Sequence, residues 1–251
     1  MNTETTIYQL EGQLKLKGMA QHLRAILEMP LHNRPGLELA LAEMVEAELF
    51  YRKEQRTAKL LKASKLRFKS PLEEVLCSNE RNLSKDTISS LATCDYILQG
   101  RHIIITGKAG CGKTWLSCAL GRQACMLGHK VIFYNIVKLA EEIALANLTG
   151  GYLKFIEKLM KNDLIILDDF GLRAMDEYLR IALYQLLDGD RDDYKTSIII
   201  TSQLATKDWY EYLNPGSQTE SILDRLLNSA SIINLEGKSL RKSKNISTFI
   251  P

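Results

Sequence analysis

The chain contains 251 residues, of which 45% are hydrophobic and 25% are charged, and its formal net charge is +3. This composition is ordinary for a soluble globular protein, and the length allows one large domain with a smaller one. No apolar run approaches the roughly 20 residues that cross a bilayer, and the N-terminus lacks the pattern of a secretory signal. The five cysteines form no Cys-x-x-Cys pair, so we expect reduced thiols in a cytoplasmic protein, neither disulfides nor zinc ligands.

Residues 1–70 are predicted to form a small all-helical domain. Its first helix carries apolar residues on one face, and a second helix runs from about residue 36 to residue 61. Pro30 and Pro35 break the two helices. A linker is expected over residues 71–86, and Pro71 opens it. We treat the helical domain as the candidate for DNA binding and oligomerisation.

The end of this helical domain is strongly basic. Only Glu54 opposes a run of positive residues, namely Arg52, Lys53, Arg56, Lys59, Lys62, Lys65, Arg67 and Lys69. The spacing of the first members would place them on one positive helix stripe. Such a stripe can be a solvated helix face, but solvated faces usually mix both signs. We therefore predict contact with nucleic-acid phosphates, with weak dependence on base sequence.

From residue 87 to residue 251 the pattern alternates between strands and helices. A helix over 87–98 precedes strands expected at 102–106, 129–134, 164–167, 197–201 and 231–235, and the helices between the strands are expected at 115–128, 137–148, 152–160, 177–187 and 221–227. This alternation predicts an α/β fold with a five-stranded parallel sheet flanked by helices. Ligands of such sheets bind at the carboxyl ends of the strands, where the motifs described next are found.

The first motif follows the first predicted strand. It reads Gly107-Lys108-Ala109-Gly110-Cys111-Gly112-Lys113-Thr114, followed by Trp115, and it has the form G-x-x-x-x-G-K-[ST] of a phosphate-binding P-loop. Its place between a strand and a helix distinguishes it from a chance glycine-rich turn. Lys113 is predicted to reach the β- and γ-phosphates of ATP, and Thr114 to hold Mg²⁺. GTP is not expected, because no [NT]-K-x-D base-recognition sequence occurs.

A Walker B pattern, an apolar strand closed by carboxylates, follows in Leu164-Ile165-Ile166-Leu167-Asp168-Asp169. Asp168 is predicted to hold Mg²⁺ through water, and Asp169 to orient the attacking water or to accept its proton. A strand followed by a capped turn would have the same letters. The P-loop earlier in the chain favours the catalytic interpretation.

Four further polar residues are candidates for sensing the nucleotide. Ser202 is the first choice for a side chain that senses the γ-phosphate and Thr201 the second, although either could simply cap a helix. Arg225 could stabilise a transferring phosphoryl group from a neighbouring subunit, and Arg241 could do so from a second position. Each arginine could equally be a surface residue paired with a nearby acid.

At this point the chain resembles a known family, IstB. The resemblance rests on the helical start with Leu14-Lys15-Leu16-Lys17-Gly18-Met19, the P-loop, Asp168-Asp169-Phe170-Gly171, Thr201-Ser202-Gln203, Ile222-Leu223-Asp224-Arg225-Leu226 and Gly237-Lys238-Ser239-Leu240-Arg241. IstB is the ATP-binding helper protein of a bacterial insertion-sequence family, and it is related to DnaC helicase loaders within the AAA+ ATPases. The resemblance covers about residues 8–245, and the combination of motifs is more specific than the two Walker motifs alone.

The resemblance implies a bacterial AAA+ ATPase that forms a ring or spiral homo-oligomer on double-stranded DNA and regulates or stimulates the transposase of the same element. It implies that ATP hydrolysis is coupled to assembly, that Arg225 is an arginine finger across the subunit interface, and that Arg241 is a second sensor. The alternative function is a DnaC-like replicative helicase loader. A small-molecule kinase is disfavoured, because no arginine-rich lid is found.

Two departures from the family pattern matter. Asp169 stands where many AAA+ proteins have Glu, and its shorter side chain suggests slow hydrolysis. Few residues follow the last predicted strand, so we expect the helical lid of larger AAA+ proteins to be absent or vestigial.

Overall fold

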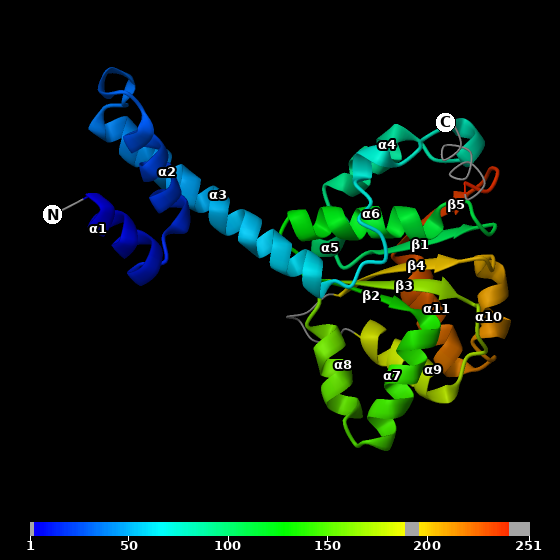
Figure 1. The fold of residues 1–251 in the computed structure, drawn as a ribbon. Coiled ribbons are helices and arrows are strands. Elements are labelled where there is room, and N and C mark those ends of the chain that lie inside the picture. The colour runs from blue at the N-terminus through cyan, green and yellow to red at the C-terminus, as the bar shows by residue number, and fades with distance from the viewer. Residues whose placement is uncertain (1–2, 189–195, 241–251) are drawn as a thin grey trace, which may run out of the picture. The chain divides into compact units, whose positions relative to one another are not determined.

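The computed structural model describes residues 3–188 and 196–240, and it divides the chain into two compact units, residues 1–59 and residues 60–251. The first unit holds α1 (Thr3–Tyr8), a π-helical turn (Gln9–Gln13), α2 (Lys17–Glu28), a 3-10 turn (Leu31–Asn33) and most of α3 (Leu37–Ala63) (Figure 1). No helix in the described ranges combines the length and the apolar character needed to cross a membrane.

Within the first unit, α2 packs closely against α3 at Gly18. A Cβ atom at this position would lie 2.4 Å from the carbonyl oxygen of Ala47, so the approach requires glycine. Glu48 is 5% exposed, and its carboxylate accepts hydrogen bonds from the backbone N–H groups of Gly18 at 2.7 Å and Met19 at 3.3 Å. A carboxylate from α3 thus satisfies donors in the first turn of α2, where the helix dipole favours negative charge.

The second unit holds the predicted sheet. Its strands are β1 (His102–Gly107), β2 (Val131–Asn135), β3 (Leu164–Phe170), β4 (Ser197–Ser202) and β5 (Ala230–Leu235), and its helices are α4 (Lys85–Ala92), α5 (Asp95–Leu98), α6 (Lys113–Met126), α7 (Ile136–Leu148), α8 (Tyr152–Met160), α9 (Glu177–Leu187), α10 (Trp209–Tyr212) and α11 (Ser217–Asn228). The strand order is β2-β3-β4-β1-β5, and every pairing is parallel. This confirms the predicted α/β fold.

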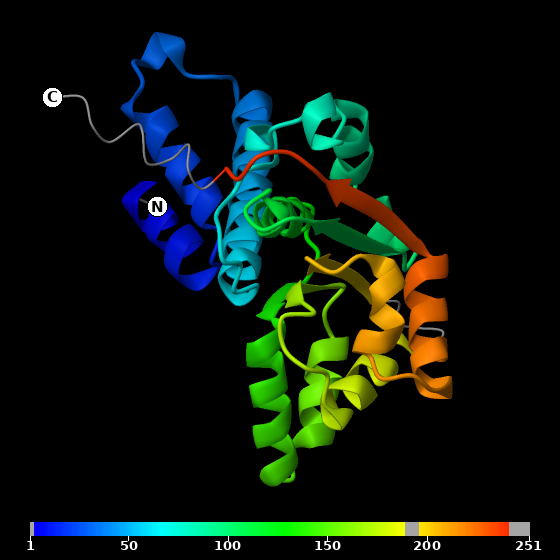
Figure 2. The same ribbon diagram turned by 90° about the vertical axis from the view of Figure 1, so that its right-hand side faces the viewer.

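Helices cover both faces of the sheet, as Figures 1 and 2 show, with α4, α5 and α6 on one face and α7 to α11 on the other. Successive strand residues point to opposite faces, so Ile103 and Ile105 belong to the apolar core beneath α6, whereas Ile104 belongs to the core beneath α7 and α9. Because both faces are buried at the centre of the sheet, β1, β3 and β4 are built on continuous apolar runs, whereas the edge strand β5 is partly exposed.

The boundary between the units differs from the prediction of a helical domain to residue 70 and a linker over 71–86. Leu72 and Leu83 are 9% and 2% exposed and belong to the core beside α6, with short 3-10 turns at Leu72–Glu74 and Asn79–Arg81. Apolar side chains hidden among polar neighbours therefore anchor this segment to the second unit. The helix expected over 87–98 is also divided, because Cys94 adopts a left-handed conformation with φ of 60° between α4 and α5.

Candidate nucleotide-binding site

The P-loop motif connects β1 to α6, as predicted. Gly107 and Gly110 have φ angles of 142° and 83°, a region that other residues rarely adopt. A Cβ atom would lie 2.2 Å from the carbonyl oxygen of Leu235 at Gly107, and 2.2 Å from Oγ of Ser239 at Gly110. The loop is therefore closely enclosed by the chain that follows β5. Its amides lead into the N-terminus of α6, which favours an anion.

Lys113, the first residue of α6, is 6% exposed and folds back over the loop. Its ammonium group donates hydrogen bonds to the carbonyl oxygens of Gly107 at 2.8 Å and Lys108 at 3.0 Å. Arg81, which the motif search missed, donates a hydrogen bond to the carbonyl oxygen of Cys111 at 2.8 Å. Two cations from distant parts of the chain thus hold the P-loop backbone, which suits a site for phosphate groups.

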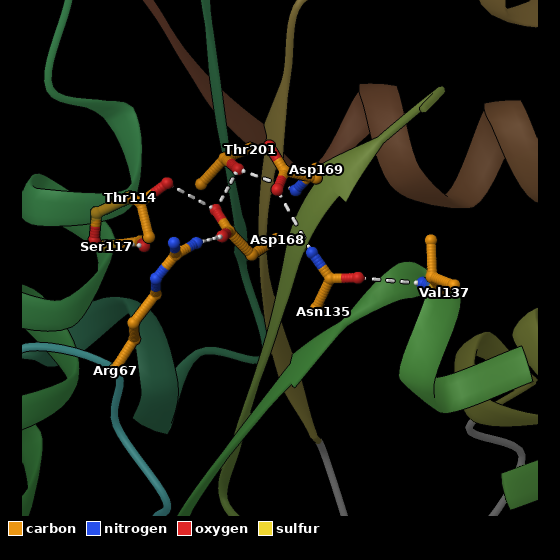
Figure 3. Close-up of polar contacts among 8 residues, drawn as sticks. All are labelled: Arg67, Thr114, Ser117, Asn135, Val137, Asp168, Asp169 and Thr201. Atoms are coloured by element: carbon orange, nitrogen blue, oxygen red, sulfur yellow. Dashed lines mark hydrogen bonds and ion pairs between the residues drawn. The ribbon is translucent and has the colours of Figure 1, made fainter. Parts of the chain in front are cut away.

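The Walker B carboxylate contacts the P-loop helix directly (Figure 3). Asp168 is fully buried, and its Oδ1 accepts hydrogen bonds from the hydroxyls of Thr114 at 2.8 Å and Thr201 at 2.6 Å. Its Oδ2 accepts no hydrogen bond. Burial raises the pKa of the Asp168 carboxyl, although the two threonine hydroxyls and Arg67 act in the opposite direction.

These residues fit a divalent cation. One buried carboxylate oxygen lacks a hydrogen bond, and a threonine hydroxyl lies against the same carboxylate. Carboxylate and hydroxyl oxygens are hard ligands of the kind that Mg²⁺ takes together with water and nucleotide phosphates. Thr114 and Asp168 are therefore the residues that would hold Mg²⁺.

Asp169 is held in an unusual backbone conformation. Its φ is 61°, and β3 continues past it to Phe170, beyond the predicted end of the strand. The N–H of Asp169 donates to Oγ1 of Thr201 at 3.1 Å, and its Oδ2 accepts a hydrogen bond from the side-chain amide of Asn135 at 3.0 Å (Figure 3). Asn135, which also caps α7 through Val137, was not predicted, because an Asn at a strand end indicates only a cap.

The side chains of the two γ-phosphate sensor candidates, Thr201 and Ser202, have different surroundings. The hydroxyl of Thr201 faces Asp168 and Asp169, whereas the hydroxyl of Ser202 donates to the carbonyl oxygen of Phe170 at 2.6 Å and accepts from the N–H of Leu204 at 3.0 Å. Alternation along β4 explains the difference, because neighbouring side chains point to opposite faces. The Ser202 hydroxyl therefore bonds to backbone groups at the end of β4 and does not face Asp168 or cap a helix.

Of the two arginine candidates, Arg225 lies within the described residues, and its partners are at α9 and directly after it. Arg225 on α11 forms an ion pair with Asp188 at 2.7 Å, and its guanidinium lies over the ring of Tyr184 at 4.8 Å. Its partner is thus an acid distant in sequence. Arg241 lies outside the described residues.

The basic residues predicted to contact DNA are all exposed, but they do not form one continuous helix stripe. Because α3 ends at Ala63, Lys65, Arg67 and Lys69 follow the helix, and the set is divided between the two compact units. Arg52 is paired with Glu48 at 2.7 Å. Arg67 lies 3.9 Å from Oδ2 of Asp168.

The free cysteines and His102 have structural roles. All five cysteines are unpaired thiols, and Cys118 and Cys125 are fully buried in the core beneath α6. Burial lowers the pKa of His102 to about 4, and its Nδ1 accepts a hydrogen bond from the N–H of Ile198 at 3.1 Å. Within the described ranges, no group of three or more His, Cys, Asp or Glu side chains is placed to hold a metal ion by itself.

A P-loop between β1 and α6, with a Walker B strand separated from β1 by one further strand, defines a P-loop NTPase of the AAA+ class. The chain belongs to the family of IstB-like ATP-binding proteins, whose family model matches residues 9–248. The resemblance inferred from the motifs is therefore confirmed.

Relatives within this family are named for insertion sequences. The chain is 36% identical to an IS1162 protein of Pseudomonas fluorescens named for ATP binding, over 81% of this chain and 87% of the relative. It is 33% identical to the insertion-sequence protein y4pL of Sinorhizobium fredii, also named for ATP binding, over 92% and 95% of the two chains.

Solved structures of replication proteins share the fold. The DnaC helicase loader superposes with a TM-score of 0.56 at 16% identity, covering 68% of this chain and 99% of that chain. AMPPCP-bound DnaA from Aquifex aeolicus superposes with a TM-score of 0.58 at 20% identity, covering 74% of this chain and 57% of DnaA. The chain thus spans little more than half of DnaA, and at these identities the likeness shows the fold alone.

Proposed function

We propose that this protein is an ATP-hydrolysing helper of transposition that assembles as a homo-oligomer on double-stranded DNA and regulates or stimulates the transposase of its insertion sequence. The observation that carries the proposal is the contact of Thr114 with the buried Asp168 beneath the P-loop. Family membership supports the insertion-sequence context, since relatives carry that name.

The proposed chemistry assigns one role to each residue of the site. Lys113 leaves its loop carbonyls to bind the β- and γ-phosphates, while the loop amides bind the remaining phosphate oxygens. Thr114 and Asp168 would hold Mg²⁺, which would supply positive charge to the phosphate oxygens. Asp169 orients the attacking water and accepts its proton, and Thr201 holds the carboxylate of Asp168 and the backbone N–H of Asp169 in place.

In the proposed oligomer, Arg225 acts on the nucleotide of a neighbouring subunit. Within one chain its guanidinium is engaged by Asp188, the residue directly after α9. In the assembled form we expect Arg225 to exchange this partner for the nucleotide phosphates of a neighbouring subunit, where a cation stabilises the transferring group. Arg241 is proposed as a second such residue.

Contacts with DNA are assigned to the exposed basic residues between Arg52 and Lys69. Each neutralised phosphate releases counterions, so the logarithm of affinity should fall against the logarithm of salt concentration with a slope of about −0.9 per contact. An affinity that does not depend on salt would rule out this role.

The test is the size of the particle, measured by light scattering with and without duplex DNA, under ATP and under ADP. Wild type should form a large particle only with ATP and DNA, and Lys113→Ala and Arg225→Ala should each abolish it. A monomer in every condition would refute the shared-site mechanism.

The neighbouring gene separates this function from helicase loading, because a transposase gene argues for the first and a replication gene for the second. A phosphate-release assay with and without DNA separates it from a small-molecule kinase.

A further inference from the structure

The segment from Ser64 to Ser70, which carries three of the basic residues, is attached to the nucleotide site of the second unit. The carbonyl oxygen of the fully buried Ser64 accepts a hydrogen bond from the N–H of Phe133 in β2 at 2.8 Å. At the other end, the hydroxyl of the fully buried Ser70 donates to the carbonyl oxygen of Trp115 at 3.2 Å. The segment is therefore anchored to β2 at one end and to the P-loop helix α6 at the other.

Between these anchors, Arg67 extends toward the magnesium-binding carboxylate (Figure 3). Its guanidinium lies 3.9 Å from Oδ2 of Asp168 and 5.4 Å from the ring centre of Phe68, which itself packs against Trp115 at 5.6 Å. The Arg67 side chain is 55% exposed, whereas Asp168 is fully buried. Arg67 thus reaches from solvent to the one oxygen of Asp168 that accepts no hydrogen bond.

The contact between Arg67 and Asp168 depends on whether another positive charge is bound at the Asp168 carboxylate. A buried carboxylate needs a compensating positive charge, and in the absence of a metal the Arg67 guanidinium supplies it. A divalent cation held by Asp168 would compensate the same negative charge and would repel the guanidinium at short range. Arg67 and Mg²⁺ would therefore compete for one carboxylate. Arg67 has a long, exposed side chain, so it can move without disturbing the core.

We propose that Arg67 is the resident counter-ion of Asp168 in the nucleotide-free protein, and that loading of Mg²⁺ and ATP releases it to bind a DNA phosphate. The inference rests on the proposed function, since it requires DNA contact by the basic segment. Linkage makes the effect reciprocal, because DNA that holds Arg67 also favours Mg²⁺ and ATP. The basic segment thereby contacts DNA, and the availability of its Arg67 side chain depends on whether Mg²⁺ and ATP are bound.

The first experiment measures the Mg²⁺ concentration that half-saturates ATP binding without DNA, by calorimetry on the full-length protein. Arg67→Gln should lower this concentration by about fivefold, a factor typical of coupled sites, because the competitor is removed. Lys69→Gln, a matched change at an exposed residue of the same segment, should leave it unchanged. A weaker affinity of Arg67→Gln for ATP at saturating Mg²⁺ would overturn the inference, since Arg67 would then be a ligand of the nucleotide.

The second experiment measures duplex affinity by fluorescence anisotropy, with and without Mg²⁺ and a non-hydrolysable ATP analogue. The analogue should tighten wild-type binding, and Arg67→Gln should abolish that increase, while Arg67→Lys should keep part of it. Lys69→Gln should weaken binding equally in both conditions. An undiminished increase in Arg67→Gln would overturn this inference alone. Absence of DNA binding by wild type in every condition would overturn the proposed function, and this coupling with it.

Discussion

Thr201 offers the sharpest test of the site, because one hydroxyl serves both Walker B carboxylate residues. It donates to Oδ1 of the fully buried Asp168 at 2.6 Å and accepts from the N–H of Asp169 at 3.1 Å. Thr201→Val keeps the shape of the side chain and removes both hydrogen bonds. We expect two results, a loss of stability and a loss of hydrolysis.

The stability loss follows from the two hydrogen bonds. A hydrogen bond to a charged group contributes roughly 1.5–3 kcal/mol, and a buried N–H left without an acceptor costs roughly 1–3 kcal/mol. Because the two effects share one site and are not additive, we expect the free energy of unfolding at neutral pH to fall by about 3 kcal/mol.

The loss of stability in Thr201→Val should become smaller as the pH falls. Thr201 lowers the pKa of the Asp168 carboxyl, which burial raises above its usual value. Without the hydroxyl, the folded-state pKa rises further above the unfolded value. A raised folded-state pKa stabilises the protonated form, and this stabilisation is lost as pH increases through that pKa. The difference between wild type and Thr201→Val should therefore shrink as the pH falls toward the pKa of Asp168.

Urea denaturation at several pH values measures the stability, and phosphate release at saturating ATP measures the hydrolysis rate. Loss of a positioned donor in an active site lowers turnover by about 10²-fold. Ser202→Ala is the matched control, because the Ser202 hydroxyl bonds only to backbone groups of Phe170 and Leu204. If Ser202→Ala stopped hydrolysis and Thr201→Val did not, the assignment of Thr201 would be wrong. An unchanged unfolding free energy in Thr201→Val would refute the hydrogen-bond reasoning.

Three further predictions concern acid stability, the P-loop and the helical unit. Burial lowers the pKa of His102 from 6.5 to about 4, so between these pH values the unfolded state binds a proton that the folded state does not. The free energy of unfolding, measured by denaturation curves, should therefore fall by roughly 3 kcal/mol as the pH decreases from 6.5 to 4. His102→Asn, which keeps a hydrogen-bond acceptor but does not titrate, should not show this loss. Arg81→Ala should weaken ATP affinity about tenfold in calorimetry, because the P-loop loses the hydrogen bond to Cys111, and unchanged affinity would show that Arg81 does not support the loop. Gly18→Ala should destabilise α2 by about 1–3 kcal/mol, since its Cβ would lie 2.4 Å from a carbonyl oxygen of α3; faster hydrogen exchange in α2 would report this, while Gly12→Ala, with its nearest neighbour at 4.0 Å, should have little effect.

Much of the fold was predictable because its signals are local. α8 and α9 begin and end at the predicted residues. The start of α9 is fixed by a local N-cap, because the side chain of Asp176 accepts a hydrogen bond from the N–H of Leu179. The central strands β1, β3 and β4 were predictable because both of their faces are buried and their runs are largely apolar. The P-loop was predictable because its glycines and Lys113 must occur at fixed spacing.

The errors arose where distant contacts decide the conformation. The left-handed conformation of Asp169 lets β3 continue through two carboxylates, and nothing in the letters Asp-Asp-Phe indicates it. The expected linker belongs to the core because Leu72 and Leu83 pack near α6, which the sequence around them does not reveal. The surroundings of Thr201 and Ser202 depend on the register of β4, and a shift of one residue exchanges the two faces.

The residues outside the motifs explain how such a site can be controlled. Arg67, Arg81 and Asn135 each contact one motif residue, respectively the carboxylate of Asp168, the carbonyl oxygen of Cys111 and the carboxylate of Asp169. At Asp169, the side-chain amide of Asn135 bonds only Oδ2 and fixes the orientation of that carboxylate. Arg67 engages the Asp168 carboxylate that is proposed to hold the metal, so in the proposed mechanism the metal-loaded conformation forms at the expense of this contact. The apparent affinity for nucleotide then falls with the fraction of competent protein, and any partner that engages Arg67 increases that fraction. The Walker residues thus supply the chemistry, whereas contacts that no motif records determine when the chemistry is available.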